Sequence, residues 1–393
     1  MPTDGGGERQ RLITREFLVV TGATLAFFTY VGVLVPLLPT LVERGLGGSK
    51  FDIGLMMASF SVAAIACRPL LAAVGERIGM RMLMVSGAVI AVCATIGAAF
   101  VTNRYALLPF RGLQGVGEAF LFVGGATVVS QSAPPSRRAE AASYYSVGVF
   151  VGLGLGPAFA DRLVNAGRYR AAFFLGAGFV VLAGLLALAG PRRSPSRHNG
   201  QATARRGPRL HRGAVLPGIA LAIGVASFSP FTAFIPDHAR SVGFGGSAVV
   251  FGLYTVVCLV VRVFGARMPQ RMGLVNAVVS SMVGMGAGMA VLASWPSQVG
   301  VVVGTVALAL GVSLLFPSLS ALASNTAADD EQVRMMSAFT MFFEVGVAMG
   351  GLVFGLVAQL TSQRGAFAAA AMTAGFGAVL VRTRVARRLG ALS

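Results

Sequence analysis

Long apolar runs divide the 393-residue sequence into segments of the length that crosses a membrane. An α-helix rises 1.5 Å per residue, so roughly 20 apolar residues span the roughly 30 Å hydrocarbon core of a bilayer. The sequence therefore predicts an all-α membrane protein with about twelve transmembrane helices. The segments are 17–39, 53–74, 82–101, 105–129, 142–160, 171–190, 214–235, 248–266, 274–293, 299–323, 336–360 and 366–381.

The composition excludes a soluble protein of this length. Hydrophobic residues make up 55% of the chain and charged residues only 12%, whereas soluble proteins carry roughly a quarter charged residues. All three histidines fall between the apolar segments, and the sequence has no Gly-Lys-Ser/Thr nucleotide-binding loop. We therefore expect neither an intramembrane enzyme nor an ATP-driven pump, and we expect no cofactor and no metal site.

The net charge of +18 follows the predicted topology. The arginines lie in short connections without interleaved aromatic residues, so we expect no nucleic-acid partner. Connections that share a side with the N-terminus hold most of them, and this excess predicts that both termini are cytoplasmic. That side has Arg9, Arg11, Arg15, Arg77, Arg81, Arg137, Arg138, the arginines of 192–212, Arg267, Arg271, Arg334 and those of 382–388, and the other has Arg44, Lys50, Arg104, Arg162, Arg168, Arg170, Arg240 and Arg364.

An arginine-rich stretch separates two sets of six helices. Residues 191–213 contain seven arginines, three prolines and no acid, which is typical of a flexible cytoplasmic linker. The predicted organisation is a cytoplasmic tail, an N-terminal six-helix bundle, this linker, a C-terminal six-helix bundle and a second cytoplasmic tail. Their bounds are 1–16, 17–190, 191–213, 214–381 and 382–393.

The two sets resemble each other at their turns. Residues 45–49 read Gly-Leu-Gly-Gly-Ser, and residues 243–247 read Gly-Phe-Gly-Gly-Ser. Arg68, Arg77 and Gly79 around the end of the second segment return as Arg262, Arg271 and Gly273 around the end of the eighth. Two six-helix pseudo-repeats about a shared cavity are an architecture suited to alternating access.

The loop 76–81, Glu-Arg-Ile-Gly-Met-Arg, resembles the acidic-Arg-x-Gly-Arg-Arg motif of the major facilitator superfamily. Met80 departs from that motif, which commonly has a basic residue there. The resemblance covers the whole chain and is strongest to bacterial proton-coupled drug and metabolite efflux permeases. It implies a conformational latch made by Arg68, Glu76, Arg77, Gly79 and Arg81, and the alternative is a set of solvated charges that only fix the topology.

The fourth segment resembles the superfamily's Arg-x-x-Gln-Gly-x-Gly motif, which is linked there with proton coupling. Arg111, Gln114 and Glu118 share one helix face, and charges at this depth require partners inside the protein. We expect Arg111, about two turns from Glu118, to favour the charged form of that acid. Glu344 in the eleventh segment is a second candidate proton site. A purely structural ion pair is the alternative for Arg111. Asp161 and Asp237 are expected at the membrane interface, with Asp237 in the loop after the seventh helix.

The fifth segment resembles the Gly-x-x-x-Gly-Pro antiporter motif through Gly152, Gly156 and Pro157. Simple helix packing is the alternative, because small residues four apart allow any two helices to approach closely. Four aromatic residues are predicted to line the substrate cavity, although packing against lipid or core is an equal alternative for each. They are Phe27, Tyr30, Phe228 and Phe231.

These features predict a secondary transporter that exports a small amphiphilic organic compound in exchange for protons. The alternative is a proton-coupled importer of a sugar or another small metabolite on the same fold. The expected partners are the small-molecule substrate, protons and the lipid bilayer. We expect the protein to act as a monomer in the bacterial inner (plasma) membrane.

The topology can be tested with fused reporters. A reporter fused after Arg205 should be cytoplasmic, and one inserted beside Gly47 should be external, because the basic loops stay on the cytoplasmic side. An external Arg205 fusion would contradict the division into two six-helix sets.

Overall fold

The computed structural model describes residues 14–133, 138–190, 212–265, 268–324 and 332–385. Most of the predicted linker 191–213, nearly all of the N-terminal tail and most of the C-terminal tail lie outside these residues. The described residues are helical throughout, joined by short turns. The long helices are α1 (Arg15–Thr40), α2 (Lys50–Ala98), α3 (Leu107–Ser132), α4 (Arg138–Asn165), α5 (Tyr169–Ala189), α6 (Arg212–Ser241), α7 (Ala248–Phe264), α9 (Leu274–Ser294), α10 (Gln298–Ser324), α11 (Gln332–Leu360) and α12 (Gln363–Leu380). The short ones are η1 (Leu41–Gly45), η2 (Arg104–Ala106), α8 (Met268–Met272) and η5 (Val381–Val385).

These helices supply the twelve expected crossings. In the described part of the chain, eleven segments are long and apolar enough to cross a membrane, and the shorter helix Ala248–Phe264 is the twelfth. Two of the crossings belong to α2, which is interrupted at Gly79, where the backbone leaves the helical conformation with φ of 82° and ψ of 155°. The predicted all-α membrane fold is therefore confirmed. The placement of Asp237 in a loop was wrong, because α6 continues to Ser241 and includes it.

The sequence repeat corresponds to a repeated backbone geometry at one of its two turns, where Gly79 and Gly273 have φ of 82° and 81°. At the other turn the glycines with positive φ are Gly47, at 62°, and Gly243, at 95°, which occupy different positions of the repeat. Glycine is favoured at these positions because a side chain disfavours positive φ. We call the end of the bundle with Gly47 and Gly243 the Gly47 end, and the end with Gly79 and Gly273 the Gly79 end.

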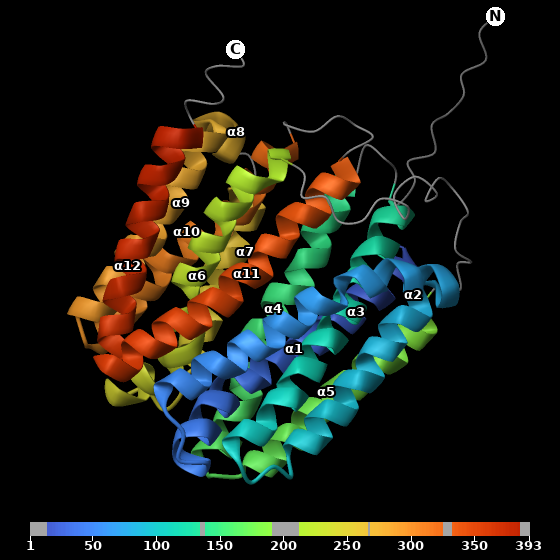
Figure 1. Cartoon of the computed structure of the whole chain (residues 1–393), viewed down its shortest axis with the longest axis horizontal. Helices are drawn as coiled ribbons and strands as arrows, with labels where there is room; N and C mark the ends of the chain where they lie inside the picture. Colours follow the sequence, from blue (N-terminus) through green and yellow to red (C-terminus); the bar gives the residue numbers. More distant parts are fainter. Residues whose placement is uncertain (1–13, 134–137, 191–211, 266–267, 325–331, 386–393) are drawn as a thin grey trace, which may run out of the picture.

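The first half, α1 to α5, and the second half, α6 to α12, lie side by side (Figure 1). They meet along two interfaces, α2 with α11 and α4 with α7. Glycines allow the close approach: a Cβ on Gly54 would lie 2.0 Å from the carbonyl oxygen of Gly351, and one on Gly154 would lie 2.1 Å from Thr255 Oγ1. A side chain at either glycine would therefore separate the halves.

Candidate functional site

Arg111 begins a chain of polar contacts inside the first half. Its Nη1 donates to Gln114 Oε1 at 2.7 Å, and Gln114 Nε2 donates to Thr95 Oγ1 at 3.2 Å. Thr95 in turn donates to the hydroxyl of Tyr30 at 2.9 Å. The guanidinium also lies over the ring of Phe60, 4.7 Å from its centroid. We expected Arg111 to have partners inside the protein, and residues of α1, α2 and α3 together provide them.

A second charged cluster joins the halves. Arg68 of α2 donates to Thr340 Oγ1 of α11 at 3.0 Å, and its Nη2 lies 4.0 Å from Glu344 Oε1. Glu344 is buried, with 8% of its surface exposed. Glu118 of α3 is half-buried and lies near enough for the charges of Glu344 and Arg68 to act on it. We call Arg68, Glu118 and Glu344 the acid cluster.

The acid cluster changes the partner that the sequence suggested for Glu118. Arg111 shares a helix face with Glu118, and we expected it to be the cation that stabilises this carboxylate. In the structure Arg68 is the cation whose charge acts on Glu118, whereas Arg111 contacts Gln114 and Phe60. Sequence spacing indicates neighbours on one helix, whereas the charge that acts on Glu118 comes from Arg68 on another helix, α2.

The repeat provides a counterpart to the contact between Arg68 and Glu344. Arg262 of α7 donates to Ser146 Oγ of α4 at 2.9 Å, and its guanidinium lies 4.3 Å from the ring centroid of Phe150. Ser146 and Phe150 are four residues apart, like Thr340 and Glu344. The two interfaces therefore share one design, in which an arginine reaches a hydroxyl and a side chain one turn further along the opposing helix. An acid occupies the last position at the α2–α11 interface, and an aromatic ring occupies it at the α4–α7 interface.

The residues predicted to form the latch lie at the Gly79 end, apart from Arg68. Glu76 and Arg77 are exposed in this conformation, Arg81 is half-buried, and Gly79 is buried. Arg68 lies deeper and belongs to the acid cluster. The predicted latch residues therefore lie at two depths. Within the described residues, the exposed charges of Glu76 and Arg77 are not paired with the second half.

The antiporter-like motif packs inside the first half. A Cβ on Gly156 would lie 2.2 Å from the backbone of Gly32, and one on Gly152 would lie 2.7 Å from the carbonyl oxygen of Leu25. Both glycines, together with buried Pro157, thus allow α4 to lie closely against α1. This is the packing geometry expected for small residues four apart.

The four aromatic residues predicted for the cavity fall into two clusters. Phe27 and Tyr30 pack edge to face, with ring centroids 5.3 Å apart, and Phe228 and Phe231 stack at 5.6 Å beside Tyr254. Phe27 and Phe231 expose 0% of their surface and Tyr30 exposes 1%, whereas Phe228 is half-buried. In this conformation only Phe228 among the four has an accessible face of any size.

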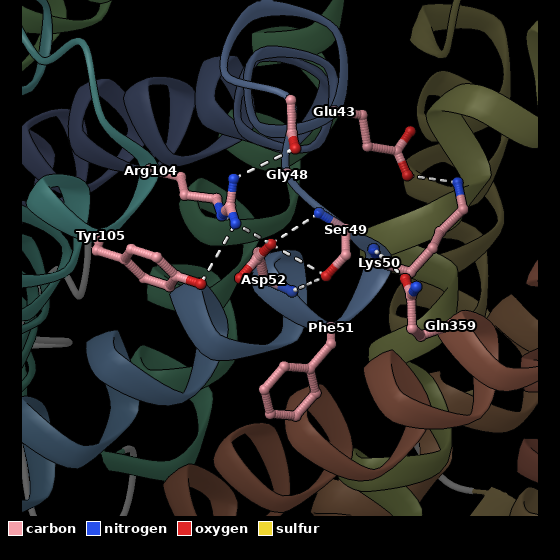
Figure 2. A pocket seen from close by; sticks show the side chains of 10 residues that line it. Glu43, Gly48, Ser49, Lys50, Phe51, Asp52, Arg104, Tyr105 and Gln359 are labelled. Carbon is pink, nitrogen blue, oxygen red and sulfur yellow. Dashed lines mark hydrogen bonds and ion pairs between the residues drawn. The ribbon is translucent and has the colours of Figure 1, made fainter.

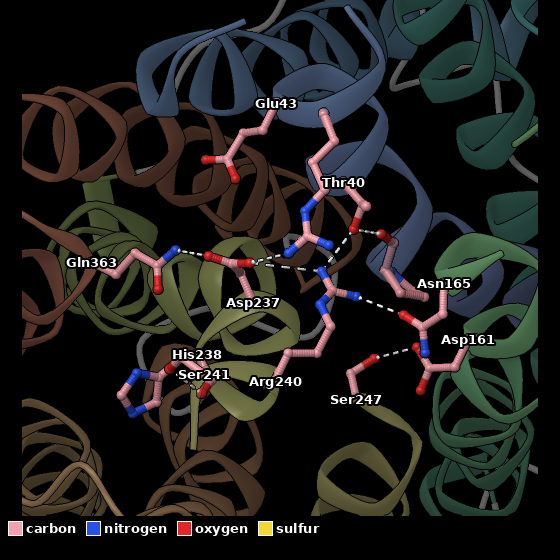
Figure 3. A network of polar contacts seen from close by, with 12 residues as sticks. Thr40, Glu43, Asp161, Asn165, Asp237, His238, Arg240, Ser241, Ser247 and Gln363 are labelled. Atoms are coloured by element: carbon pink, nitrogen blue, oxygen red, sulfur yellow. Dashed lines mark hydrogen bonds and ion pairs between the residues drawn. The ribbon is translucent and has the colours of Figure 1, made fainter. Parts of the chain in front are cut away.

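An ion network that the sequence did not suggest joins the halves at the Gly47 end (Figure 3). Asp237 of α6 pairs with Arg44 of η1 at 3.1 Å, and Lys50 of α2 lies 3.8 Å from the same carboxylate. Arg240 of α6 donates to Thr40 Oγ1 of α1 at 2.8 Å. The placement of Asp237 and Arg240 on one face of α6 could have indicated this network, but their partners are distant in sequence.

Comparison with known proteins identifies the family. The sequence profile of the Major Facilitator Superfamily matches residues 20–277 and 218–391. The chain belongs to this superfamily. It is 25% identical to an uncharacterized MFS-type transporter of Salmonella typhimurium over 386 residues, which cover 92% of this chain and 94% of that protein. It is also 25% identical to Multidrug resistance protein 1 of Bacillus subtilis over 351 residues, which cover 86% and 89% of the two chains.

A solved structure gives the same fold. The nucleoside transporter NupG matches with a TM-score of 0.72 at 15% identity, over 95% of this chain and 99% of that one. The superfamily assignment confirms the resemblance seen at 76–81 and at Arg111. The protein is a multi-pass membrane transporter of small molecules and not an enzyme. Within the described residues, no group of three His, Cys, Asp or Glu side chains is placed to hold a metal ion.

The acid cluster predicts the order of stability among three variants. Arg68→Gln should destabilise the protein by about 3–5 kcal/mol, because it leaves the buried Glu344 carboxylate without its cation. Arg68→Gln combined with Glu344→Gln should recover part of that loss, since the buried side chain at 344 then carries no charge, although Glu118 still lacks its cation. Arg262→Gln is the matched control and should cost about 1 kcal/mol, the value of a hydrogen bond, because the partners of Arg262 among the described residues are the hydroxyl of Ser146 and the ring of Phe150 and not an acid. Thermal unfolding in detergent measures all three, and a double variant as unstable as Arg68→Gln would contradict the pairing.

Proposed function

We propose that this transporter exports a small amphiphilic organic compound in exchange for protons. The observation that carries the proposal is the acid cluster, in which carboxylates from opposite halves lie beside one arginine. Proton binding at Glu118 and Glu344 can then depend on how the halves are arranged. The name of the Bacillus subtilis relative, a multidrug resistance protein, supports export of amphiphilic compounds.

The proposal places the protein in the bacterial plasma membrane with both termini in the cytoplasm. The Gly79 end then faces the cytoplasm and the Gly47 end faces outward, as the excess of arginine near the Gly79 end favours. Residues 17–190 and 214–381 act as two bundles that rock about the substrate. Because the ion network joins the halves at the Gly47 end, this conformation is the one that receives substrate from the cytoplasm.

The acid cluster links protonation to this rocking. Arg68 and Glu118 move with the first half, and Glu344 moves with the second. Separation of the two halves at this depth removes Glu344 from the field of Arg68, and the proton affinities of both acids change with conformation. Proton flow is thereby tied to substrate flow. Arg111 and Gln114 position α3 through their contacts with Thr95 and Tyr30.

The remaining motifs either stabilise the conformation that is open at the Gly47 end or pack helices together. When the Gly47 end opens, the Gly79 end closes, and the exposed charges of Glu76 and Arg77 reach the second half as a latch beside Gly79 and Arg81. Gly152, Gly156 and Pro157 keep α4 rigidly against α1 during this movement. The four aromatic residues predicted for the cavity lie behind or along the substrate path, namely Phe27, Tyr30, Phe228 and Phe231. The transporter works as a monomer.

Substitution of Glu118 tests the coupling. In proteoliposomes with an imposed pH gradient, the wild type should concentrate a lipophilic dye such as ethidium, and a protonophore should abolish this accumulation. Glu118→Gln holds the site in a neutral form of nearly equal volume, so uphill accumulation should fall by about tenfold or more while dye binding remains within a few-fold. Flux measurements and dye-binding titrations provide the two readouts.

The matched control is Glu16→Gln, which removes an acid from the first turn of α1, outside the acid cluster. It should transport the dye like the wild type. If Glu118→Gln still concentrates the dye, coupling does not run through Glu118. If the wild type instead takes up a sugar or another metabolite together with protons, the importer alternative replaces the proposed direction.

A further inference from the structure

A surface pocket of about 500 Å³ lies at the Gly47 end, where α2 of the first half meets the second half. The N–H of Lys50, at the start of α2, donates to Gln359 Oε1 of α11 at 3.1 Å, and both residues line the pocket. The rest of its wall comes from the end of α6, from Pro296 before α10 and from the turn that leads into α12. We call it the α12 pocket. The described residues that line it include the cations Lys50 and Arg364 and no acid.

A neighbouring pocket of about 570 Å³ also includes Lys50, but its charges are balanced (Figure 2). There Arg104 pairs with Asp52 at 3.2 Å, and the ammonium group of Lys50 donates to Glu43. Each cation of the neighbouring pocket is therefore neutralised by an acid of the first half. Because Lys50 is shared between the two pockets, the unneutralised cation of the α12 pocket is Arg364.

The first turn of α12 presents hydrogen-bond donors to the α12 pocket. Arg364 is exposed, and its Nε donates to the carbonyl oxygen of Ala293 at 2.6 Å, but no described acid pairs with it. The hydroxyl of Ser362 accepts from the N–H of Gly365 at 3.1 Å. The N–H groups of Gln363 and Arg364 have no partner within the described residues, as is usual for the start of a helix. These donors and the helix dipole favour an anion.

Two other helix starts at this end are bound by acids of the chain itself. At α2, the N–H of Ser49 donates to Asp52 Oδ2 at 2.7 Å in a reciprocal capping box. At α7, the N–H of Ala248 donates to Asp161 Oδ2 of α4 at 2.6 Å. The described lining of the α12 pocket has no acid that could serve the start of α12 in this way.

A buried histidine gives an independent indication of a ligand. His238 of α6 lines the α12 pocket and exposes 3% of its surface, and its Nε2 has no hydrogen-bond partner among the described residues. Its ring packs edge to face on Phe367 of α12, with centroids 5.3 Å apart, and points away from Arg240 and Asn165 (Figure 3). A buried nitrogen without a partner costs free energy, which a ligand that pairs with it recovers. Nε2 donates a hydrogen bond when it carries the proton.

We propose that the α12 pocket binds an oxyanion, supplied as a free phosphate-like ion or as the phosphodiester of a lipid headgroup. The anion accepts hydrogen bonds from the guanidinium of Arg364, from the first N–H groups of α12 and from His238 Nε2. Lys50 belongs to the first half and the other lining residues to the second, so the complete pocket requires a closed Gly47 end. A bound anion therefore favours closure and slows opening. The effect on transport rests on the proposed function.

Phosphate titration tests the site without any transport. Calorimetry in a phosphate-free maltoside detergent, with chloride used to keep the ionic strength constant, should show saturable binding of inorganic phosphate to the wild type. Arg364→Gln should weaken the affinity by about tenfold or more, because it removes a charged donor. His238→Phe keeps a ring against Phe367 and should weaken the affinity several-fold.

The matched control is Arg104→Gln, which removes an arginine from the neighbouring pocket. It should bind phosphate like the wild type, because that arginine does not line the α12 pocket. The absence of saturable phosphate binding, or an equal affinity in Arg364→Gln, would overturn the proposal.

A lipid comparison distinguishes the two sources of the oxyanion. Phosphatidylcholine carries a phosphodiester without net charge, so it competes for the α12 pocket without repelling phosphate from the membrane surface. If the headgroup is the occupant, phosphate affinity should be several-fold lower in phosphatidylcholine nanodiscs than in maltoside, and native mass spectrometry should detect a phospholipid that Arg364→Gln loses. If the free ion is the occupant, the two affinities should be equal.

Dye flux tests the effect on opening. With saturating phosphate on both sides of the proteoliposome membrane, ethidium flux through the wild type should fall several-fold relative to chloride, whereas Arg364→Gln should resist this inhibition. An equal loss in both proteins, or no loss in the wild type, would overturn the link between the pocket and opening. A wild type that moves no ethidium would contradict the proposed function alone, because the titration does not depend on transport.

Discussion

The hydrocarbon core of the membrane contains no water, and every buried charge and every helix end must therefore find its partner within the protein. In this transporter the partners are found largely where the two halves meet. Arg68 reaches Thr340 and Glu344, Arg262 reaches Ser146, and the ends of α2 and α7 bind side chains from the opposite half. The polar contacts between the halves consequently stabilise this arrangement, and those at the Gly47 end must break when that end opens.

The two interfaces follow one plan with different chemistry. Each has a helix N-terminus bound by the opposite half at the Gly47 end and an arginine contact nearer the Gly79 end. Along α2 and α11, the cap contact and the arginine contact lie about four residues further apart than along α4 and α7, which is about one helical turn. The longer interface has a neutral cap, Gln359, and an ionisable partner, Glu344. The shorter one has an ionisable cap, Asp161, and a neutral partner, Phe150, so each interface has one acid among these contacts, at a different depth.

The sequence predicted the crossings and the repeat because hydropathy and glycine turns are local signals. Gly79 and Gly273 indeed share a positive φ, and all-α membrane architecture follows from the apolar runs alone. The sequence could not predict that α6 extends past Asp237, since packing decides that boundary. The electrostatic effect of Arg68 on Glu118 and the contact of Asp161 with α7 join elements remote in sequence, and spacing on one helix suggested Arg111 as the cation for Glu118 instead.

The central claim is that substrate export and proton entry are coupled through the acid cluster. A substrate gradient should then drive proton movement, just as a proton gradient drives substrate movement. Sealed proteoliposomes loaded with a lipophilic dye such as ethidium, with equal pH on both sides, provide the most direct test. As the dye leaves through the transporter, a trapped pH indicator should report acidification of the interior, and the combination of Glu118→Gln with Glu344→Gln should abolish it. Dye efflux without a pH change, or with alkalinisation of the interior, would contradict proton exchange.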